Sequence, residues 1–162
     1  ELHHDKSCPY AIVLLDLDHF KNINDQFGHH MGDTVLIAVS QKLGLHLRES
    51  DVVGRFGGEE FILILKQSSA LKARQIAERC RAAIEDLVIQ NEDGRAIRIT
   101  ASFDIALATD KLKPQQLLDQ ADKALYAAKA SERNQIKCYL EINPCEIKYS
   151  AACGDTQHIS PN

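Results

Sequence analysis

The sequence predicts an α+β fold in which helices flank a central sheet of about five strands. One observation is a continuous apolar run at residues 11–17, and a second is a pair of apolar runs, at 51–56 and 61–65, joined by a short turn. A third is the strict alternation of apolar and polar residues at 95–107, which is typical of a strand. Helical segments separate these runs, so the order β-α-α-β-β-α-β-α-β reduces to βαββαβ, a ferredoxin-like arrangement with an antiparallel sheet.

The composition is that of one ordinary globular domain. A chain of 162 residues, 44% hydrophobic and 26% charged, can bury a core of its own. A net charge of −4 without Lys/Arg-rich runs argues against nucleic acid and against direct contact with a membrane. The five cysteines are odd in number and form no CxxC pair, which argues against a zinc site or a disulfide framework. No apolar run approaches the ~20 residues that span a bilayer, and the missing initiator Met suggests a fragment of a longer protein.

The first third of the chain predicts a strand and two helices. Ala11–Leu17 is expected to be a central strand, buried on both faces, with Asp16 near its carboxyl end. A helical turn follows at residues 18–27, and Gly28 ends it. A long helix is expected at residues 30–48, with four core positions at helical spacing: Leu36, Val39, Leu43 and Leu47.

The stretch Arg55–Phe61 reads Arg-Phe-Gly-Gly-Glu-Glu-Phe and predicts a tight β-hairpin. We expect its glycines, Gly57 and Gly58, to supply positive φ at the bend. The tip then presents Glu59 and Glu60, for which the ordinary alternative is a pair of solvated turn acids.

A third helix follows, with Ser68 as its expected cap. Its apolar stripe consists of Ala73, Ile76, Ala77, Cys80, Ala83, Ile84 and Leu87. Residues 95–107 are then expected to form a half-exposed strand, with Ser102 and Asp104 on the solvent side.

The last long helix is expected to begin at Pro114, and a final strand at Gln135–Ile142. We therefore place one domain at residues 1–142. Residues 143–162 are expected to be a tail of uncertain order.

Asp16 and Glu59 are expected to meet at one edge of the sheet, because one ends a central strand and the other lies on the hairpin beside it. Hard divalent ions such as Mg²⁺ take oxygen ligands, a few from protein and the rest from water and phosphate. Two such ions ~4 Å apart can bind a triphosphate and activate a hydroxyl, as in polymerases and cyclases. The two acids therefore predict a magnesium–nucleotide site.

Four segments resemble, in order and spacing, the signatures of one family. They are Asp16–Asp25 (Asp-Leu-Asp-His-Phe-Lys-Asn-Ile-Asn-Asp), Gly28–Asp33, Arg55–Phe61 and Ala121–Lys129 (Ala-Asp-Lys-Ala-Leu-Tyr-Ala-Ala-Lys). The chain is similar to the GGDEF domain, the diguanylate cyclase module of bacteria, in its Gly-Gly-Glu-Glu-Phe form. The resemblance runs from about residue 10 to about residue 140 and implies the palm fold of nucleotidyl cyclases.

The resemblance implies that two GTP condense to cyclic di-GMP and two pyrophosphates, as each 3′-hydroxyl attacks an α-phosphate, in bacterial second-messenger signalling. Each protomer holds one GTP, so turnover implies a homodimer. An upstream sensor domain and a cytoplasmic location, in a free or membrane-anchored protein, are implied with it. One alternative is a degenerate domain of the same fold that binds GTP or cyclic di-GMP and regulates a partner. A general palm-type nucleotidyl transferase is another, against which the Asn24 and Asp33 pair argues.

The family motif also implies roles for the acidic residues. Asp16, the Leu17 carbonyl and Glu59 would hold two Mg²⁺ or Mn²⁺ ions in each active site. Glu59 or a metal would help to deprotonate the attacking hydroxyl, and Glu60 is a further catalytic candidate.

Three residues are candidates for contacts with the nucleoside of GTP. Asn24 and Asp33 are similar to the family's guanine readers, since a carboxylate accepts from the N1–H and N2–H₂ donors that adenine lacks. Without the motif, Asp33 would be an acid stabilised by a helix dipole. His29 is implied near the ribose or base, and its alternative is a surface histidine.

Four further residues are candidates for phosphate contacts. Phe20 and Lys21 open a helical turn whose free N–H groups suit phosphate, and Lys21 can neutralise charge on the phosphoryl group. Lys129 and Arg133 are four residues apart and can clamp a triphosphate together. The alternatives are a solvated lysine for Lys21 and complementation of the helix dipole for the other two.

Arg48 and Asp51 form an Arg-x-x-Asp pattern ahead of Gly57 and resemble the family's inhibitory product site. Arg79 is a candidate for the secondary part of that site. The alternative for the first two is an ordinary i to i+3 ion pair, worth ~0.3 kcal/mol.

The chain departs from the family pattern at three places. Asp104 and Glu132 stand where the family commonly has glycine, and Glu132 also puts an acid beside Lys129 and Arg133. The Asp-x-Leu-Thr and Asn-Arg-Arg segment expected before the first strand is absent. The two substitutions favour the binding module, whereas the intact Gly-Gly-Glu-Glu-Phe favours the enzyme.

Overall fold

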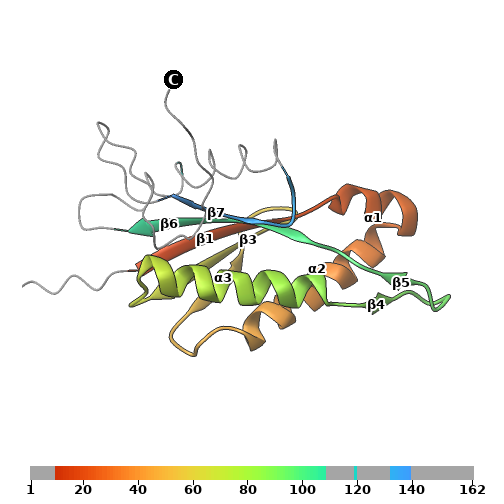
Figure 1. Ribbon diagram of the computed structural model, residues 1–162. Helices are drawn as coiled ribbons and strands as arrows, with labels where there is room; N and C mark the ends of the chain where they lie inside the picture. The colour runs from red at the N-terminus through yellow and green to blue at the C-terminus, as the bar shows by residue number, and fades with distance from the viewer. Residues whose placement is uncertain (1–9, 109–118, 120–131, 140–162) are drawn as a thin grey trace, which may run out of the picture.

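A five-stranded sheet organises the part of the chain that the computed structural model describes, which comprises residues 10–108, 119 and 132–139. Its strand order is β2-β3-β1-β6-β7 (Figure 1). The strands are β1 (Tyr10–Leu17), β2 (Val52–Arg55), β3 (Glu60–Lys66), β6 (Ala101–Ala108) and β7 (Ile136–Tyr139). Only β7 runs parallel to its neighbour, β6. The predicted α+β fold is therefore confirmed, with a sheet that is mixed instead of antiparallel throughout.

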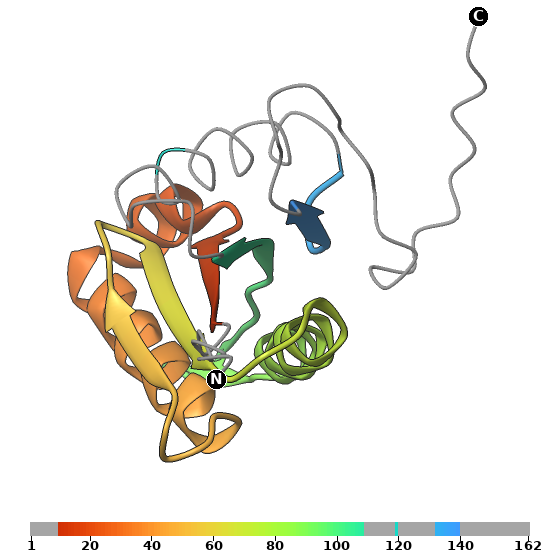
Figure 2. The same ribbon diagram turned by 90° about the vertical axis from the view of Figure 1, so that its left-hand side faces the viewer.

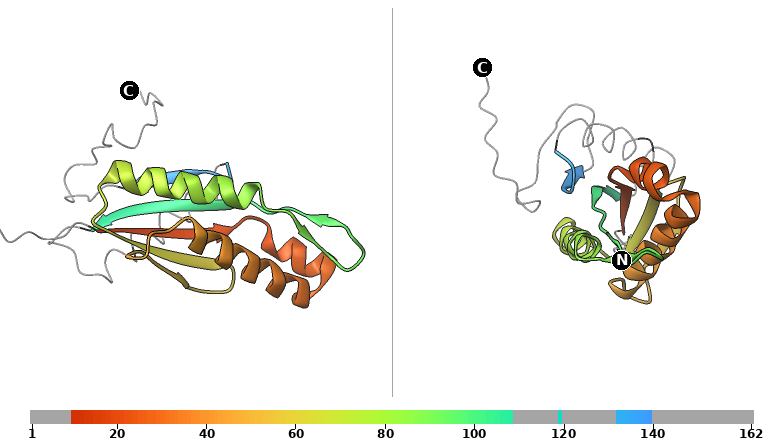
Figure 3. Two further views of the ribbon diagram at one scale, coloured as in Figure 1. Left: turned by 90° about the horizontal axis from the view of Figure 1, so that it is seen from below. Right: turned by 90° about the vertical axis from the view of Figure 1, so that its right-hand side faces the viewer.

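Within the described residues, three helices accompany the sheet: α1 (Phe20–Phe27), α2 (His29–Leu45) and α3 (Ala70–Glu85). Seen from below, α2 and α3 lie side by side over one face of the sheet (Figure 3). Helix α1 lies beyond the carboxyl end of β1, at the same end of the sheet as a small hairpin made of β4 (Ile89–Gln90) and β5 (Ala96–Ile97) (Figure 1). The view along the strands shows the sheet curving over the two long helices (Figure 2).

Strand β1 occupies the centre of the sheet, between β3 and β6. Its residues Ala11–Leu17 are at most 4% exposed, on both faces of the strand. This burial explains why the run is continuously apolar until it reaches Asp16. Leu36, Val39 and Leu43 of α2 are buried in the same cluster, which confirms that face of the helix. Leu47, the fourth predicted core position, is partly buried against the cluster but lies beyond the end of the helix at Leu45.

The strand predicted at 95–107 was wrong in two respects. It divides into β5 and β6, and the polar residues Ser102 and Asp104 are fully buried instead of facing solvent. Alternation of apolar and polar residues correctly indicated a strand with two different faces, but it does not show that the polar face is exposed to solvent. Ser102 is accommodated because its hydroxyl donates a hydrogen bond of 2.7 Å to Asp18 Oδ1.

The cap of α3 also differs from its prediction. Ser69, not Ser68, caps the helix, since its side chain accepts a hydrogen bond from the Lys72 amide. The Ser68 hydroxyl is engaged elsewhere: it donates to the Lys66 carbonyl and accepts from Arg48 Nη2.

Some predictions fall on residues that the structure does not describe. They are the helix from Pro114, the site residue Lys129 and the tail at 143–162, so the domain boundary at residue 142 stays a prediction. Within the described residues, no helix has both the length and the apolar character needed to cross a membrane.

Asp104 is a fully buried carboxyl group in β6, where it pairs with Leu14 of β1 and Lys137 of β7. Neither of its carboxyl oxygens forms a geometrically sound hydrogen bond with the described part of the protein. Burial raises the pKa of Asp104 to about 8, although the nearby Ile105 amide and the charge of Lys137 act in the opposite direction. We infer that the folded protein holds this carboxyl group protonated at neutral pH.

We expect Asp104→Ala to raise the free energy of unfolding near neutral pH by about 1–3 kcal/mol, because a poorly satisfied buried carboxyl group is removed. The folded pKa lies above the ordinary value of 3.8, so the stability of the parent falls as pH rises from about 4 to about 8. The gain from the substitution should therefore shrink as the pH falls towards 4. Urea unfolding across this range measures both effects.

Glu92→Ala, which removes an exposed acid from the β4–β5 turn, serves as the control for Asp104→Ala. A difference in stability between Asp104→Ala and the parent that is independent of pH would contradict this interpretation of Asp104.

Candidate functional site

The end of β1 and the tip of the β2–β3 hairpin meet at one end of the sheet. The Leu17 amide donates a hydrogen bond of 3.2 Å to the Glu59 carbonyl. One step back along β1, Asp16 lies directly opposite Glu60 in the antiparallel register. The two acidic segments are therefore adjacent in space, although more than forty positions separate them in the sequence.

The Arg55 side chain holds the tip of this hairpin through hydrogen bonds to the backbone. Its Nε donates to the carbonyls of Gly57 and Gly58 at 3.1 and 3.0 Å, and its Nη2 donates to Gly58 at 2.7 Å. The amides of Phe56 and Gly57 both donate to the Glu60 carbonyl, which closes the turn through the backbone. This role of Arg55 was not predicted from the sequence, and its position two residues before Gly57 was the available signal.

The expectation of positive φ at Gly57 and Gly58 was wrong. Among the described glycines, positive φ occurs at Gly28 and Gly94. At Gly57, a Cβ atom would lie 2.9 Å from Oε2 at the flexible end of the Glu60 side chain. The Glu60 carboxylate therefore folds over its own turn, and the glycine makes room for it.

A cleft of about 400 Å³ opens between α1, α2 and the hairpin tip. It is lined by Phe20, Lys21, Asn24, His29, Asp33, Leu36, Arg55, Gly58 and Glu59. Six of the residues proposed from the sequence are thus brought into one cavity. Glu60, Asp16 and Leu17 adjoin this cleft in the chain and the sheet but do not line it.

The approach of α1 to α2 depends on Gly32. A Cβ atom at this position would overlap Oδ1 of Asn24 and would lie 3.2 Å from Cζ of Phe20. Glycine therefore lets both side chains of α1 press against the first turns of α2. This contact places Asn24 near Asp33, the next residue of α2, and so assembles one end of the cleft.

The oxygen ligands proposed for a metal form a small set: the Asp16 carboxylate, the Leu17 carbonyl and the Glu59 carboxylate. Their segments are adjacent through the Leu17–Glu59 backbone hydrogen bond. No group of three or more His, Cys, Asp or Glu side chains in the described ranges could hold an ion alone. Two carboxylates and a carbonyl suit Mg²⁺, which keeps several waters and takes further oxygens from a phosphate ligand.

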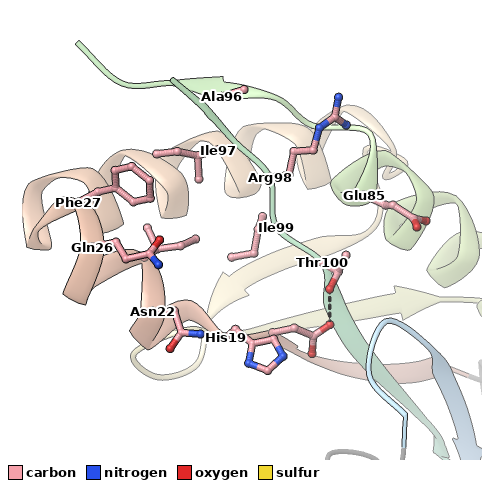
Figure 4. Close-up of a pocket in the computed structure, with 12 residues that line it drawn as sticks. His19, Asn22, Gln26, Phe27, Glu85, Ala96, Ile97, Arg98, Ile99 and Thr100 are labelled. Atoms are coloured by element: carbon pink, nitrogen blue, oxygen red, sulfur yellow. Dashed lines mark hydrogen bonds between the residues drawn. The ribbon is translucent and has the colours of Figure 1, made fainter. Parts of the chain in front are cut away.

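Asp18 is an acid to which the sequence analysis gave no role. It is 6% exposed and accepts hydrogen bonds from Thr100, Ser102 and the Asn134 amide. Its neighbourhood borders a second cleft of about 640 Å³, on the other side of α1 from the first. Asn22 and Gln26 of α1 line this cleft together with Ile99 and Thr100 of the segment opposite the helix (Figure 4).

Arg48 and Asp51 form a two-pronged ion pair. Arg48 Nε and Nη2 each donate to a different oxygen of Asp51 at 3.1 Å. Burial raises the pKa of Asp51, but the hydrogen bonds from Arg48 and the Lys66 amide outweigh it and hold that pKa below its usual value. The Arg48 side chain remains 43% exposed, whereas that of Asp51 is fully covered. The ion pair proposed as the alternative is therefore present, and product binding stays a prediction.

The two remaining arginines among the predicted site residues, Arg79 and Arg133, lie far apart in the fold's element order. Arg79 of α3 donates a hydrogen bond of 2.6 Å to the His46 carbonyl, so it contacts the loop that carries Arg48 and Asp51. Arg133 is exposed on the segment just before β7 and does not line the cleft.

We expect Arg55→Ala to loosen the hairpin tip without unfolding the domain, because it removes three hydrogen bonds to the two glycine carbonyls. Hydrogen exchange at the Phe56 and Gly57 amides should accelerate by about fivefold or more. The free energy of unfolding should change by about 1 kcal/mol or less, since the side chain is exposed.

Arg95→Ala, in the β4–β5 turn, is the matched control for Arg55→Ala. Unchanged exchange at both hairpin amides of the Arg55 variant would show that the guanidinium does not hold the tip.

Comparisons with known proteins identify the family of this chain. The family described as "Diguanylate cyclase, GGDEF domain" matches residues 1–135. Diguanylate cyclase A of Treponema denticola is 38% identical over 133 residues, which are 82% of this chain and 36% of that protein. The chain thus spans about a third of this curated relative.

Two solved structures are similar to the chain. Diguanylate cyclase SiaD of Pseudomonas aeruginosa, in complex with its activator SiaC, is 35% identical, with a TM-score of 0.77 over 80% of this chain and 50% of that one. The GGDEF domain of DgcB from Caulobacter crescentus, in complex with c-di-GMP, is 28% identical, with a TM-score of 0.76 over 81% and 78%. From the family match, its relatives and the fold that they share, the chain belongs to the GGDEF domain family of diguanylate cyclases.

Proposed function

We propose that this domain is an active diguanylate cyclase, which condenses two GTP into cyclic di-GMP and two pyrophosphates in the presence of Mg²⁺ or Mn²⁺. The observation that carries the proposal is the cleft in which Asn24 and Asp33 face the same space as Glu59. A relative with the family fold is named as a diguanylate cyclase, and another was solved with c-di-GMP.

The α1–α2 end of the cleft suits guanine. The Asp33 carboxylate can accept from both N1–H and N2–H₂, and the partly buried Asn24 amide can pair with the remaining edge of the base. Adenine lacks this pair of donors, so it would leave the carboxylate unsatisfied, which disfavours binding. His29, at the first position of α2, borders the same space and is placed for the ribose or the base.

The hairpin end of the cleft suits the reacting groups. Asp16, the Leu17 carbonyl and Glu59 would hold the metal ions. Bound Mg²⁺ would lower the pKa of the 3′-hydroxyl and neutralise charge on the phosphates. Glu59 would orient the hydroxyl and accept its proton, and Glu60, folded over the turn, is the further candidate for that step.

Positive charge in and near the cleft suits the triphosphate. Lys21 lines the cleft from the first turn of α1, beside the Phe20 amide at the start of the helix. Lys129 and Arg133 would complete the phosphate site from the segment before β7.

A single cleft of this size suits one GTP, whereas the reaction joins two. Each nucleotide supplies one 3′-hydroxyl and one α-phosphate, so two clefts must face each other in a symmetric homodimer. Since the chain spans about a third of its curated relative, a sensor domain elsewhere in the full protein would control how the two domains meet.

Product inhibition is proposed for the surface around Arg48, Asp51 and Arg79. The exposed part of the Arg48 guanidinium can bind a phosphate of cyclic di-GMP, while Asp51 orients it through the two-pronged pair. Arg79 contacts the same loop from α3 and supplies a second positive charge there.

A second candidate function is a domain that binds GTP or cyclic di-GMP without turnover and regulates a partner. The buried carboxyl group of Asp104 favours it, because such a group lowers the stability of the fold at neutral pH. Glu132 favours it as well, because its charge lies next to Arg133 in the sequence.

We expect Glu59→Gln to lower the rate of cyclic di-GMP formation by about 100-fold or more, since it removes a ligand charge while keeping the shape of the side chain. The measurement is incubation of the full-length protein with GTP and Mg²⁺, with the nucleotide products resolved. Glu92→Gln applies the same change to the exposed β4–β5 turn and should leave the rate unchanged.

Equal yields from the parent and Glu59→Gln would refute the metal assignment. GTP binding without any product from the parent would favour the regulatory module instead.

We expect Arg48→Ala to leave the initial rate within about twofold of the parent but to abolish inhibition by added cyclic di-GMP. Since the variant also leaves Asp51 covered and without its main partner, urea unfolding must show that the protein is still folded. Arg79→Ala should weaken the inhibition to a smaller extent, and Arg95→Ala should not affect it. Inhibition that persists in Arg48→Ala would place the product site elsewhere.

A further inference from the structure

Asp18 joins three separate parts of the chain through its carboxylate. Thr100 Oγ1 and Ser102 Oγ each donate to it at 2.7 Å, and the Asn134 amide donates at 3.0 Å. These contacts span up to 116 positions of sequence. A carboxylate that is only 6% exposed is tolerated when donors surround it in this way, and each charge-assisted bond is stronger than a neutral one.

Asn134 is the partner whose conformation is unusual. Its φ of 54° lies in the left-handed region, which asparagine adopts more readily than most residues. In this conformation its amide is bonded to Asp18, and its side chain reaches α3, where Oδ1 accepts from Arg81 Nη1 at 2.8 Å. Its Nδ2 donates to Glu85 Oε1 at 3.0 Å. One residue thereby connects the end of β1 to α3.

The α3 side of this connection is itself fixed. Arg81 donates two hydrogen bonds to Glu78, at 2.9 and 2.7 Å, and a third to Glu85 at 2.7 Å. The Arg81 side chain is only 16% exposed, whereas its partners Glu78 and Glu85 are 53% and 46% exposed. Asn134 therefore docks on a preformed surface of the helix.

The backbone after Asn134 is also held. The Phe103 amide of β6 donates to the Gln135 carbonyl at 2.8 Å, directly before β7 begins. The segment at residues 132–135 is thus attached to Asp18 after β1, to α3 and to β6, while the side chain of Arg133 within this segment stays exposed. Because the backbone of this segment is fixed, the flexible Arg133 side chain can reach only a limited set of positions.

We propose that Asn134, held by Asp18 and α3, is a positioning residue that fixes Arg133 at the end of β1 for contact with the triphosphate. The inference rests on the proposed function for its ligand. Its physical basis is preorganisation: a loop that is already ordered does not lose its backbone freedom when the nucleotide binds. Asn134 itself touches no reacting group.

A double-mutant cycle tests this role. Asn134→Gly keeps the left-handed backbone accessible and removes the side-chain contacts to Arg81 and Glu85. Arg133→Ala removes the proposed phosphate ligand. We expect each variant to lower kcat/KM for GTP by about tenfold, equal to about 1.4 kcal/mol. The double variant should be no worse than Arg133→Ala alone, because Asn134 acts only through Arg133.

Asn91→Gly is the matched control, since Asn91 also uses its side chain to hold a turn, by accepting from the Arg95 amide at 2.8 Å. It should leave kcat/KM unchanged. Multiplicative effects of the Asn134 and Arg133 substitutions would overturn the proposal, because Asn134 would then act independently of Arg133. A parent protein that neither binds nor turns over GTP would instead overturn the proposed function.

A measurement without nucleotide tests whether the Asp18–Asn134 hydrogen bond holds the segment before β7. The Asn134 amide should exchange slowly with solvent in the parent, and faster by about tenfold in Asp18→Asn, which keeps the shape but weakens the acceptor. Urea unfolding should show that both proteins are folded. An Asn134 amide that exchanges at the rate of an open loop in the parent would overturn the proposal whatever the chain does with GTP.

Discussion

The register between β1 and β3 is the constraint on which the site depends. Seven residue pairs, from Tyr10 opposite Lys66 to Asp16 opposite Glu60, align the end of the central strand with the tip of the hairpin. A slip by one residue would turn every side chain of β3 to the other face of the sheet, so burial of Phe61, Leu63 and Leu65 fixes this alignment. The Leu17–Glu59 hydrogen bond is the last contact of the ladder. Ordinary core packing thus places the acids.

Helix α1 acts as a partition between two clefts. One side of the helix carries Lys21 and Asn24 to the cleft of the proposed reaction, and another carries Asn22 and Gln26 to the second cleft. The helix has only eight residues, so its position depends on its contacts at both sides and on Gly32 beneath it. Asp18 is attached to β6 and to Asn134 just before the helix begins. Asp18, two residues before α1, therefore helps to fix the position of Lys21 and Asn24, which are the proposed nucleotide contacts of this helix.

The features predictable from the sequence are those that depend on neighbours in the chain. Periodicity predicted α2, α3 and the hairpin, because an amphipathic helix and a tight turn are local structures. The burial of Ser102 and Asp104 was not predictable, since alternation does not show what covers the polar face. Arg55 was missed although the carbonyls that it binds are only two and three positions away. Asn134 was missed because its hydrogen bonds reach residues that the local pattern does not reveal. For Asn134 the bonded residue is 116 positions away.

The two substitutions of family glycines, Asp104 and Glu132, affect properties other than the shape and the polar groups of the cleft. Asp104 lies in the middle of β6, opposite Leu14, and does not line the cleft. Burial of the Asp104 carboxyl group lowers the free energy of unfolding of the whole domain, and this effect does not depend on where the active site lies. Glu132 is exposed, so solvent screens its effect on Arg133. Neither residue alters the shape or the donors of the cleft, and a loss of activity caused by either one should therefore be recoverable by conditions that stabilise the fold or raise the GTP concentration.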